Sequence, residues 1–329
     1  MKKKLIIWIV VLIILLVIID AFYFTFSSFY TPDQNLKSNI NRSIYIAPYV
    51  GDFDGTVSEE WYPFYKTLTD FHEKNEIPVT FSFYPYTIQN NTEFNNLILR
   101  MYNSEYIELM QKGYKGDDRE LAMERLSYEE QREIIKQGQD HFREKMKKLA
   151  GNQEIEVPKI YNQIGAEFTE DTKRAAQSLG FNFYFDVYVG DRAKAVKSTD
   201  DFFITEYGIS FTKSGDAGKE NGFKSTNAVF KEINEHSRSD LNVLTLNGKE
   251  FIPLWSHQQD FESMFAENKL DKNKWEIYTN TLKALQNDPN VTLITPEEFY
   301  ILSHNITVEK TLVNSSESNR TLTKVISLN

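Results

Sequence analysis

Between residues 43 and 304, short apolar segments typical of strands alternate with amphipathic segments that have helical spacing. The predicted strands are residues 43–49, 78–83, 106–109, 159–161, 181–188, 251–256 and 291–294. Helices are expected between them, and two of these begin at recognisable N-caps, Ser127 with Glu130 in a capping box and Thr169. This alternation predicts a parallel sheet, and about seven such units favour a barrel over an open sheet.

The N-terminal segment, residues 1–26, predicts a membrane anchor. Lys2, Lys3 and Lys4 precede an apolar run from Leu5 to Phe26 that only Asp20 interrupts. As a helix this run would be about 33 Å long, enough for a hydrocarbon core of about 30 Å. The basic flank before the helix predicts a cytoplasmic N-terminus and a main domain outside the cell. A cleaved signal peptide is the alternative, although no small-residue cleavage site follows the run.

The remaining chain divides by composition into three parts. We expect a polar linker at residues 27–42, one globular domain at residues 43–304 and a polar C-terminal tail at residues 305–329. Inside the domain, residues 197–241 are polar and are expected to form an irregular insertion with one short helix.

Charge and composition exclude several kinds of site. A formal net charge of −10 argues against nucleic acid, whose binding proteins carry basic patches. No glycine-rich phosphate loop is present, so we expect no nucleotide. The absence of cysteine excludes disulfides and thiolate metal ligands.

Polar side chains with catalytic potential gather where predicted strands end, which is where parallel α/β folds place their functional groups. They are Asp52 and Asp54 after the first strand, Asp186 in the aromatic strand, and His257 with Asp260 after the strand that contains Trp255. Two close carboxylates separate their pKa values, which suits a base beside a nucleophile or metal ligand. The alternative is structural, because Asp and Gly also form ordinary turns. The histidines His72 and His141 are expected on charged helix surfaces.

Five segments, in this order, resemble the polysaccharide deacetylase (NodB-like) family. They are Gly51–Gly55 with the strand Ile77–Phe83, Leu126–Gln131, Pro158–Gly165 with the helix after it, Pro253–His257, and Thr295–Phe299. The resemblance covers about residues 43 to 303. It implies an α/β fold, a distorted (β/α)7-type barrel, here preceded by one transmembrane helix.

Members of that family remove acetyl groups from cell-surface glycans, and the N-deacetylases among them hydrolyse a C–N bond. The resemblance implies a divalent metal, usually zinc, held by one Asp and two His. By position, Asp54 would be the metal ligand and His257 the general acid. The position of the base falls on Phe53, and Asp52 would replace it if the strand ends with a shifted register. We expect Trp255, Tyr161 and Asp186 to contact the substrate.

The family's His-xxx-His pair is missing from this chain. Residues 106–118 contain no histidine, and the two ligand positions fall on Met110 and Tyr114 or on Lys112 and Gly116. A catalytic zinc needs about three protein ligands. An active site would therefore need replacements, for which Glu108, Asp117 and Asp118 are the nearby carboxylates.

Three functions remain open from the sequence. The first is an extracytoplasmic glycan deacetylase with altered metal ligands. The second is a non-catalytic module that binds a glycan or a protein through the same cleft. The third is a metal-independent glycoside hydrolase that uses Asp carboxylates. Whether the chain is an enzyme is not decided by these residues.

Overall fold

The computed structural model describes residues 37–53, 58–88, 92–162, 169–185, 202–205, 208–212, 223–235, 244–263, 266–304, 308–312 and 320–324. The predicted anchor, Asp54 and Asp186 lie outside these residues. A membrane-spanning helix is not found in the described part of the chain, since none of its helices combines sufficient length with an apolar sequence.

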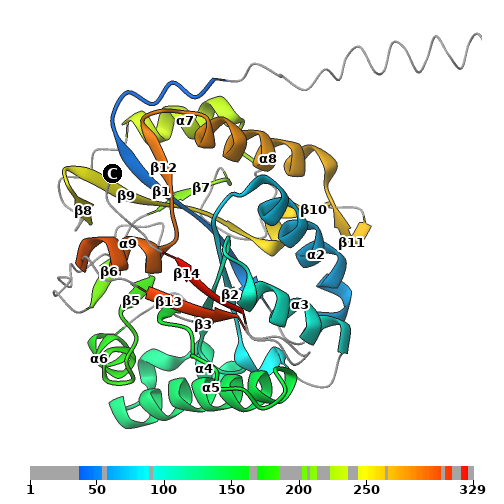
Figure 1. The fold of residues 1–329 in the computed structure, drawn as a ribbon, viewed down its shortest axis with the longest axis vertical. Coiled ribbons are helices and arrows are strands. Elements are labelled where there is room, and N and C mark those ends of the chain that lie inside the picture. Colours follow the sequence, from blue (N-terminus) through cyan, green and yellow to red (C-terminus); the bar gives the residue numbers. More distant parts are fainter. Residues whose placement is uncertain are drawn as a thin grey trace, which may run out of the picture. The chain divides into compact units, whose positions relative to one another are not determined.

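One large sheet forms the centre of the domain (Figure 1). Its strands are β1 (Ile44–Phe53), β2 (Val79–Phe83), β3 (Ile107–Lys112), β4 (Ile160–Asn162), β5 (Phe183–Phe185), β6 (Phe203–Thr205), β7 (Ile209–Ser210), β8 (Thr245–Leu246), β9 (Lys249–His257) and β12 (Val291–Leu293). The order is β6-β5-β4-β3-β2-β1-β9-β7, with β12 added to β1 and β8 to β9. Among the described strand pairs of this sheet, only β8–β9 is antiparallel.

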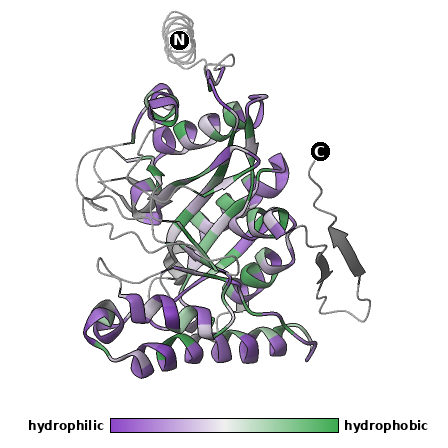
Figure 2. Ribbon diagram, turned by 90° about the vertical axis from the view of Figure 1, so that its left-hand side faces the viewer, coloured by the Kyte–Doolittle hydropathy of each residue, from purple (hydrophilic) through white to green (hydrophobic). Residues whose placement is uncertain are grey.

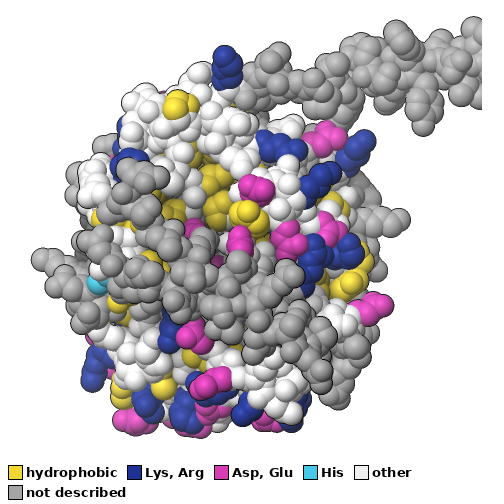
Figure 3. Space-filling view, in the orientation of Figure 1, with side chains coloured by type: hydrophobic (Ala, Val, Ile, Leu, Met, Phe, Trp, Pro, Cys, Tyr) yellow, Lys and Arg dark blue, Asp and Glu magenta, His cyan; other side chains and the backbone are white. Residues whose placement is uncertain are grey.

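Helices follow most of these strands and turn their polar faces outward (Figure 2). They are α2 (Ser58–Asn75), α3 (Thr92–Asn103), α4 (Asp118–Leu121), α5 (Tyr128–Leu149), α6 (Glu170–Ser178), α7 (Thr226–Glu235), α8 (Lys272–Gln286) and α9 (Pro296–His304), with the short turns η2 (Pro85–Thr87), η3 (Met123–Arg125) and η4 (Gln258–Phe261). On the face drawn in Figure 3, basic and acidic side chains are interspersed. Oppositely charged side chains one helical turn apart form ion pairs along the helices, such as Glu144 with Lys148 on α5.

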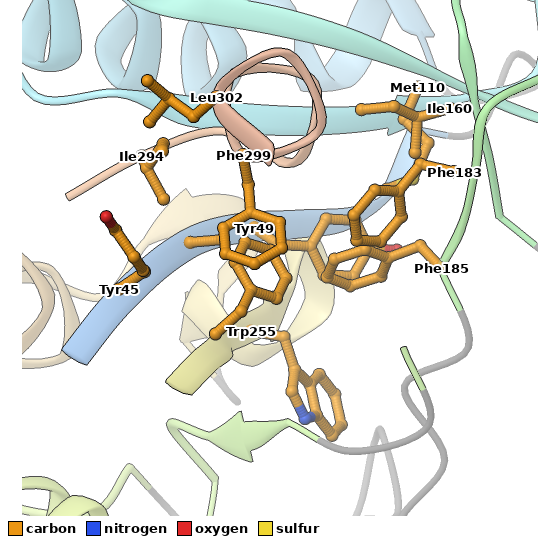
Figure 4. Close-up of a cluster of buried hydrophobic side chains, with 12 residues drawn as sticks. Tyr45, Tyr49, Met110, Ile160, Phe183, Phe185, Trp255, Ile294, Phe299 and Leu302 are labelled. Carbon is orange, nitrogen blue, oxygen red and sulfur yellow. The ribbon is translucent and has the colours of Figure 1, made fainter. Parts of the chain in front are cut away.

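The two faces of the sheet bury different clusters because side chains alternate along each strand. The inner cluster joins β1, β3, β4, β5 and β9 to α9, and Figure 4 shows Tyr49 among Phe185, Phe299 and Trp255. The outer cluster packs β4, β5 and β6 against α5 and α6. The sheet curls around the inner cluster, and α9 covers part of it.

The parallel strand–helix architecture agrees with the prediction, but the described strands do not close into a barrel. The terminal strands of the order, β6 and β7, do not pair with each other among the described residues. Both lie in the segment 197–241, for which the sequence predicts an irregular insertion with one short helix. The helix is present as α7, but the segment also supplies these two strands of the sheet. Strands of two or three residues are too short to show alternation in a sequence.

Among the described residues, two small hairpins lie outside this sheet. Strands β10 (Glu262–Ser263) and β11 (Ala266–Leu270) pair antiparallel after β9. In the predicted polar tail, β13 (Val308–Leu312) and β14 (Arg320–Lys324) pair antiparallel with each other.

His72 lies in the core, and its expected position on a charged helix surface is wrong. The side chain is fully buried on α2, where Nδ1 lies 2.9 Å from the carbonyl oxygen of Ile77 and Nε2 lies 2.9 Å from the hydroxyl of Tyr278. Because a carbonyl can only accept, Nδ1 carries the proton and Nε2 accepts from Tyr278. Burial lowers the pKa of His72 to about 3.

Candidate functional site

The pairing of β1 with β2 is irregular near the carboxyl end of β1, at Asp52, the residue predicted as the base. Val50 pairs with Phe81 and Phe53 pairs with Phe83, so Gly51 and Asp52 both lie opposite the single residue Ser82. Bulges of this kind re-aim side chains and are frequent beside active sites. The pairing of β1 with β2 therefore shifts in register across Gly51 and Asp52. The side chain of Asp52 and the whole of Asp54 lie outside the description.

His257 lies beside this irregularity, at the end of β9. It is the register partner of Gly51, and a Cβ atom on Gly51 would come within 2.9 Å of Cδ2 of His257 and 2.8 Å of the Tyr49 hydroxyl. The lack of a side chain at Gly51 therefore lets both rings approach β1. The backbone N–H of His257 donates a hydrogen bond to Oδ2 of Asp260 at 2.7 Å. The centre of the His257 ring lies 4.8 Å from that of the Trp255 ring. The imidazole therefore lies at the edge of the sheet where the parallel strands end, which we call the mouth of the sheet.

The expected substrate contacts of Trp255 and Tyr161 do not agree with their burial. Trp255 is 2% exposed and forms the edge of the inner cluster (Figure 4). Tyr161 is fully buried on the outer face, where its hydroxyl donates to Sδ of Met123. Burial raises the pKa of Tyr161. Its neighbour Ile160 is the residue of β4 that faces inward, so Tyr161 points away from the mouth.

At the end of β3, the two positions where the resemblance implies metal-binding histidines hold residues that pack against other side chains. Lys112 is nearly buried, with Nζ 5.5 Å from the ring centre of Tyr84. Gly116 has φ +75, and a Cβ atom there would lie 2.8 Å from the Tyr84 ring. Met110, the first ligand position if the pair is instead Met110 and Tyr114, is buried in the inner cluster. An ammonium group and an aromatic ring thus stand where the metal-binding imidazoles would be.

A buried carboxylate that the sequence reasoning missed fixes the loop after β3. The carboxylate of Glu120 accepts backbone N–H groups from Tyr114, Lys115 and Gly116 at 2.8 to 3.0 Å. Burial raises the pKa of Glu120, and these hydrogen bonds oppose the rise. The available signal was the pair of glycines around the loop, Gly113 and Gly116, both of which have positive φ.

The other carboxylates near β3 have structural partners. Asp117 caps α4 by accepting the N–H of Glu120 at 3.1 Å, and Asp118 lies exposed in the first turn of that helix. Across the described ranges, no three His, Asp or Glu side chains are placed to hold a metal ion together. The donors present at the end of β3 do not fit the zinc site that the resemblance implies, because a lysine there repels a cation.

Glu108, the remaining replacement ligand, lies at the opposite end of β3. Its carboxylate accepts hydrogen bonds from the hydroxyl of Thr80 at 3.3 Å and from the backbone N–H of Glu297, on α9, at 3.4 Å. Burial, and then the neighbouring charges of Glu297 and Glu298, raise the pKa of Glu108 well above its ordinary value. Glu108 therefore belongs to the packing of α9 against the sheet.

Replacing Glu108 by glutamine is expected to stabilise the protein increasingly as the pH rises. Because its pKa is raised, Glu108 is protonated in the folded state over a range where the unfolded chain is ionised. The free energy of unfolding then falls by up to about 1.4 kcal/mol per pH unit above the unfolded pKa, until the folded pKa is reached. Urea unfolding at pH 5 and pH 7 should show a larger gain for Glu108→Gln at pH 7. The exposed Glu129→Gln is the control, and an equal gain at both pH values would contradict the assignment.

Comparison with known proteins identifies the fold. No protein-family model matches the sequence, and no curated protein matches it. A protein of Mycobacterium smegmatis assigned as a polysaccharide deacetylase is 12% identical with a TM-score of 0.54, over 87% of this chain and 99% of that one. The 4-α-glucanotransferase of Thermococcus litoralis is 13% identical with a TM-score of 0.51, over 79% of this chain, which spans only 40% of the enzyme. The chain thus shares an α/β fold with a protein assigned as a polysaccharide deacetylase, as the resemblance of its sequence predicts, and its described strands form a curled sheet in place of the predicted closed barrel.

Proposed function

We propose that this chain is a membrane-anchored, extracytoplasmic protein that binds a cell-surface glycan, and that its metal-dependent deacetylation is altered or lost. Two observations support a carbohydrate ligand. Both solved structures compared above are, by their names, proteins that act on carbohydrates. The mouth of the sheet also contains His257, whose imidazole can hydrogen-bond to a sugar, beside the backbone of Gly51 and Asp52.

The residues at the end of β3 support the proposal that the metal-dependent chemistry is altered or lost. Lys112 and Gly116 pack against Tyr84, so neither position supplies a metal donor, and a cationic ammonium group lies close by. If the chain still hydrolyses an N-acetyl group, Asp52 and His257 would have to act without the His pair. The role of Asp54 as a metal ligand remains part of the altered-site alternative.

Metal content tests this proposal directly. The full-length chain, purified in detergent without chelator, is expected to contain no stoichiometric zinc or other divalent metal by plasma mass spectrometry. Asp54→Ala is expected to give the same content as the wild type. One bound metal per chain that disappears in Asp54→Ala would contradict a lost metal site and would indicate a deacetylase with altered ligands. His304→Ala, on α9, is the matched control for non-specific binding to histidine.

A metal-independent glycoside hydrolase is the second candidate, and the fold shared with the glucanotransferase favours it. This function would use carboxylates such as Asp52, Asp54, Asp186 and Asp260, and the distance between the two catalytic carboxyl groups would decide the stereochemical outcome. It predicts release of sugars that resists chelators and is lost when one of these carboxylates is changed.

A further inference from the structure

Tyr86, on η2, is the large apolar or aromatic side chain that the described part of the chain exposes most, at 37%. Its ring lies 5.7 Å from that of Tyr114 and 6.0 Å from that of His141, and the latter two rings are 5.5 Å apart. Nζ of Lys115 lies 5.1 Å from the ring centre of Tyr86 and 5.3 Å from that of Tyr114. We call Tyr86, Tyr114, Lys115 and His141 the tyrosine platform.

The platform is fixed by hydrogen bonds. The backbone N–H of Tyr86 donates to the carbonyl of Tyr114 at 3.0 Å, which joins the loops after β2 and β3. The carboxylate of Glu120 holds the backbone of Tyr114 and Lys115. Nε2 of His141 donates to the carbonyl of Ile88 at 3.0 Å, and burial lowers the pKa of His141, which favours a neutral ring. An exposed ring on such a support loses little conformational entropy when a ligand binds.

The platform is continuous with the mouth of the sheet. Tyr84 contacts Gly116 and Lys112 at the end of β3, and Pro85 alone separates it from Tyr86 along the chain. Both loops follow the carboxyl ends of their strands, where His257 also lies. The platform and His257 therefore lie at the same edge of the sheet.

We propose that the tyrosine platform is an outer subsite that binds one sugar ring of the glycan, and this inference rests on the proposed function. The apolar face of a pyranose stacks on an aromatic ring because both offer flat, weakly hydrated area. The ammonium of Lys115 donates a hydrogen bond to a sugar oxygen, either a hydroxyl or the carboxylate of an acidic sugar. A polysaccharide fits these features better than a second copy of the chain, because the exposed area centres on a single ring beside a cation.

The test is affinity electrophoresis of the full-length chain in detergent through gels containing glycol chitin or polygalacturonate. The wild type should be retarded by at least one of them, and Tyr86→Ala should bind about tenfold more weakly. Tyr86→Phe retains the ring and should stay within about twofold of the wild type. Lys115→Met should weaken binding, and more so for polygalacturonate if the ligand is acidic. Circular dichroism melting should show that each variant folds.

Tyr128→Ala is the matched control. Tyr128 is another surface tyrosine with a cation over its ring, Arg174 at 4.9 Å, and it lies about 20 Å from His141 along α5. Retardation of the wild type with no change in Tyr86→Ala would overturn the subsite and leave the proposed function standing. No retardation of the wild type by either polymer would overturn both. A dimer of the wild type that dissociates in Tyr86→Ala, seen by sedimentation, would assign the platform to self-association and overturn the subsite.

Discussion

Alanine at Gly138 is expected to destabilise the protein by roughly 3 kcal/mol, although glycine in a helix interior normally gains stability from this change. A Cβ atom at Gly138 would lie 2.5 Å from the carbonyl oxygen of Gly113 and would also collide with Nε2 of Gln111. That nitrogen donates to the carbonyls of Ile135 and Gly113 at 2.8 and 2.9 Å. The methyl group would therefore separate α5 from the end of β3 and leave buried polar groups without partners.

Urea unfolding of Gly138→Ala beside Gln137→Ala would measure this effect. Gln137 is the exposed neighbour on the same helix, so its substitution should change the free energy of unfolding by no more than about 0.5 kcal/mol. A Gly138→Ala variant as stable as the wild type would mean that α5 and the loop after β3 are not in this contact. Because the same loop carries Tyr114 and Lys115, the variant should also weaken glycan binding.

Long strands with a run of apolar residues, and helices with a recognisable N-cap, could be predicted from the sequence. Strands β1 and β9 are long enough for their apolar residues to be recognised, and they pair in register from Ile44 to Gly51. The capping box of Ser127 and Glu130 is present at the start of α5, and Thr169 caps α6. These signals are local, because a cap or a run of apolar residues acts on its own neighbours.

Features that depend on tertiary contacts could not be predicted. The sequence places Tyr161 in a motif, but only the pairing of β4 decides whether Ile160 or Tyr161 faces inward, and a shift of one residue reverses the answer. Glu120 resembles any other acidic residue of a short helix until the loop of Tyr114 to Gly116 folds over it. Likewise, His72 stands between charged residues in the sequence and faces the core in the structure.

The candidate site was predicted in part. His257 and the irregular end of β1 lie together, and Gly51 permits their close approach. The absence of a histidine pair was visible in the sequence, whereas the contacts that fill its place required the structure. The role of Tyr84 could not be predicted, because its ring becomes significant only through its contacts with Lys112 and Gly116.

Acidification is expected to destabilise the protein through His72. Its pKa falls from an ordinary value near 6.5 to about 3 on folding, so the unfolded chain binds a proton in this range and the folded chain does not. The stability that neutral His72 provides is therefore complete above about pH 6.5 and is lost as the pH falls, by roughly 1.4 kcal/mol per pH unit. Glu108 has the opposite effect, because above its ordinary pKa it lowers the free energy of unfolding as the pH rises. The pH dependence of the wild-type stability alone would therefore understate the contribution of His72.

Two variants isolate the contribution of His72. Between pH 7 and pH 5 the free energy of unfolding of the wild type should fall by about 2 kcal/mol more than that of His72→Gln, which cannot titrate in this range. Tyr278→Phe removes the hydroxyl partner of Nε2 but keeps the buried imidazole, so its pH slope should match the wild type even if its stability is lower. Equal slopes in the wild type and His72→Gln would mean that water reaches the ring of His72. The burial of α2 against α8 would then be looser than the contact between His72 and Tyr278 implies.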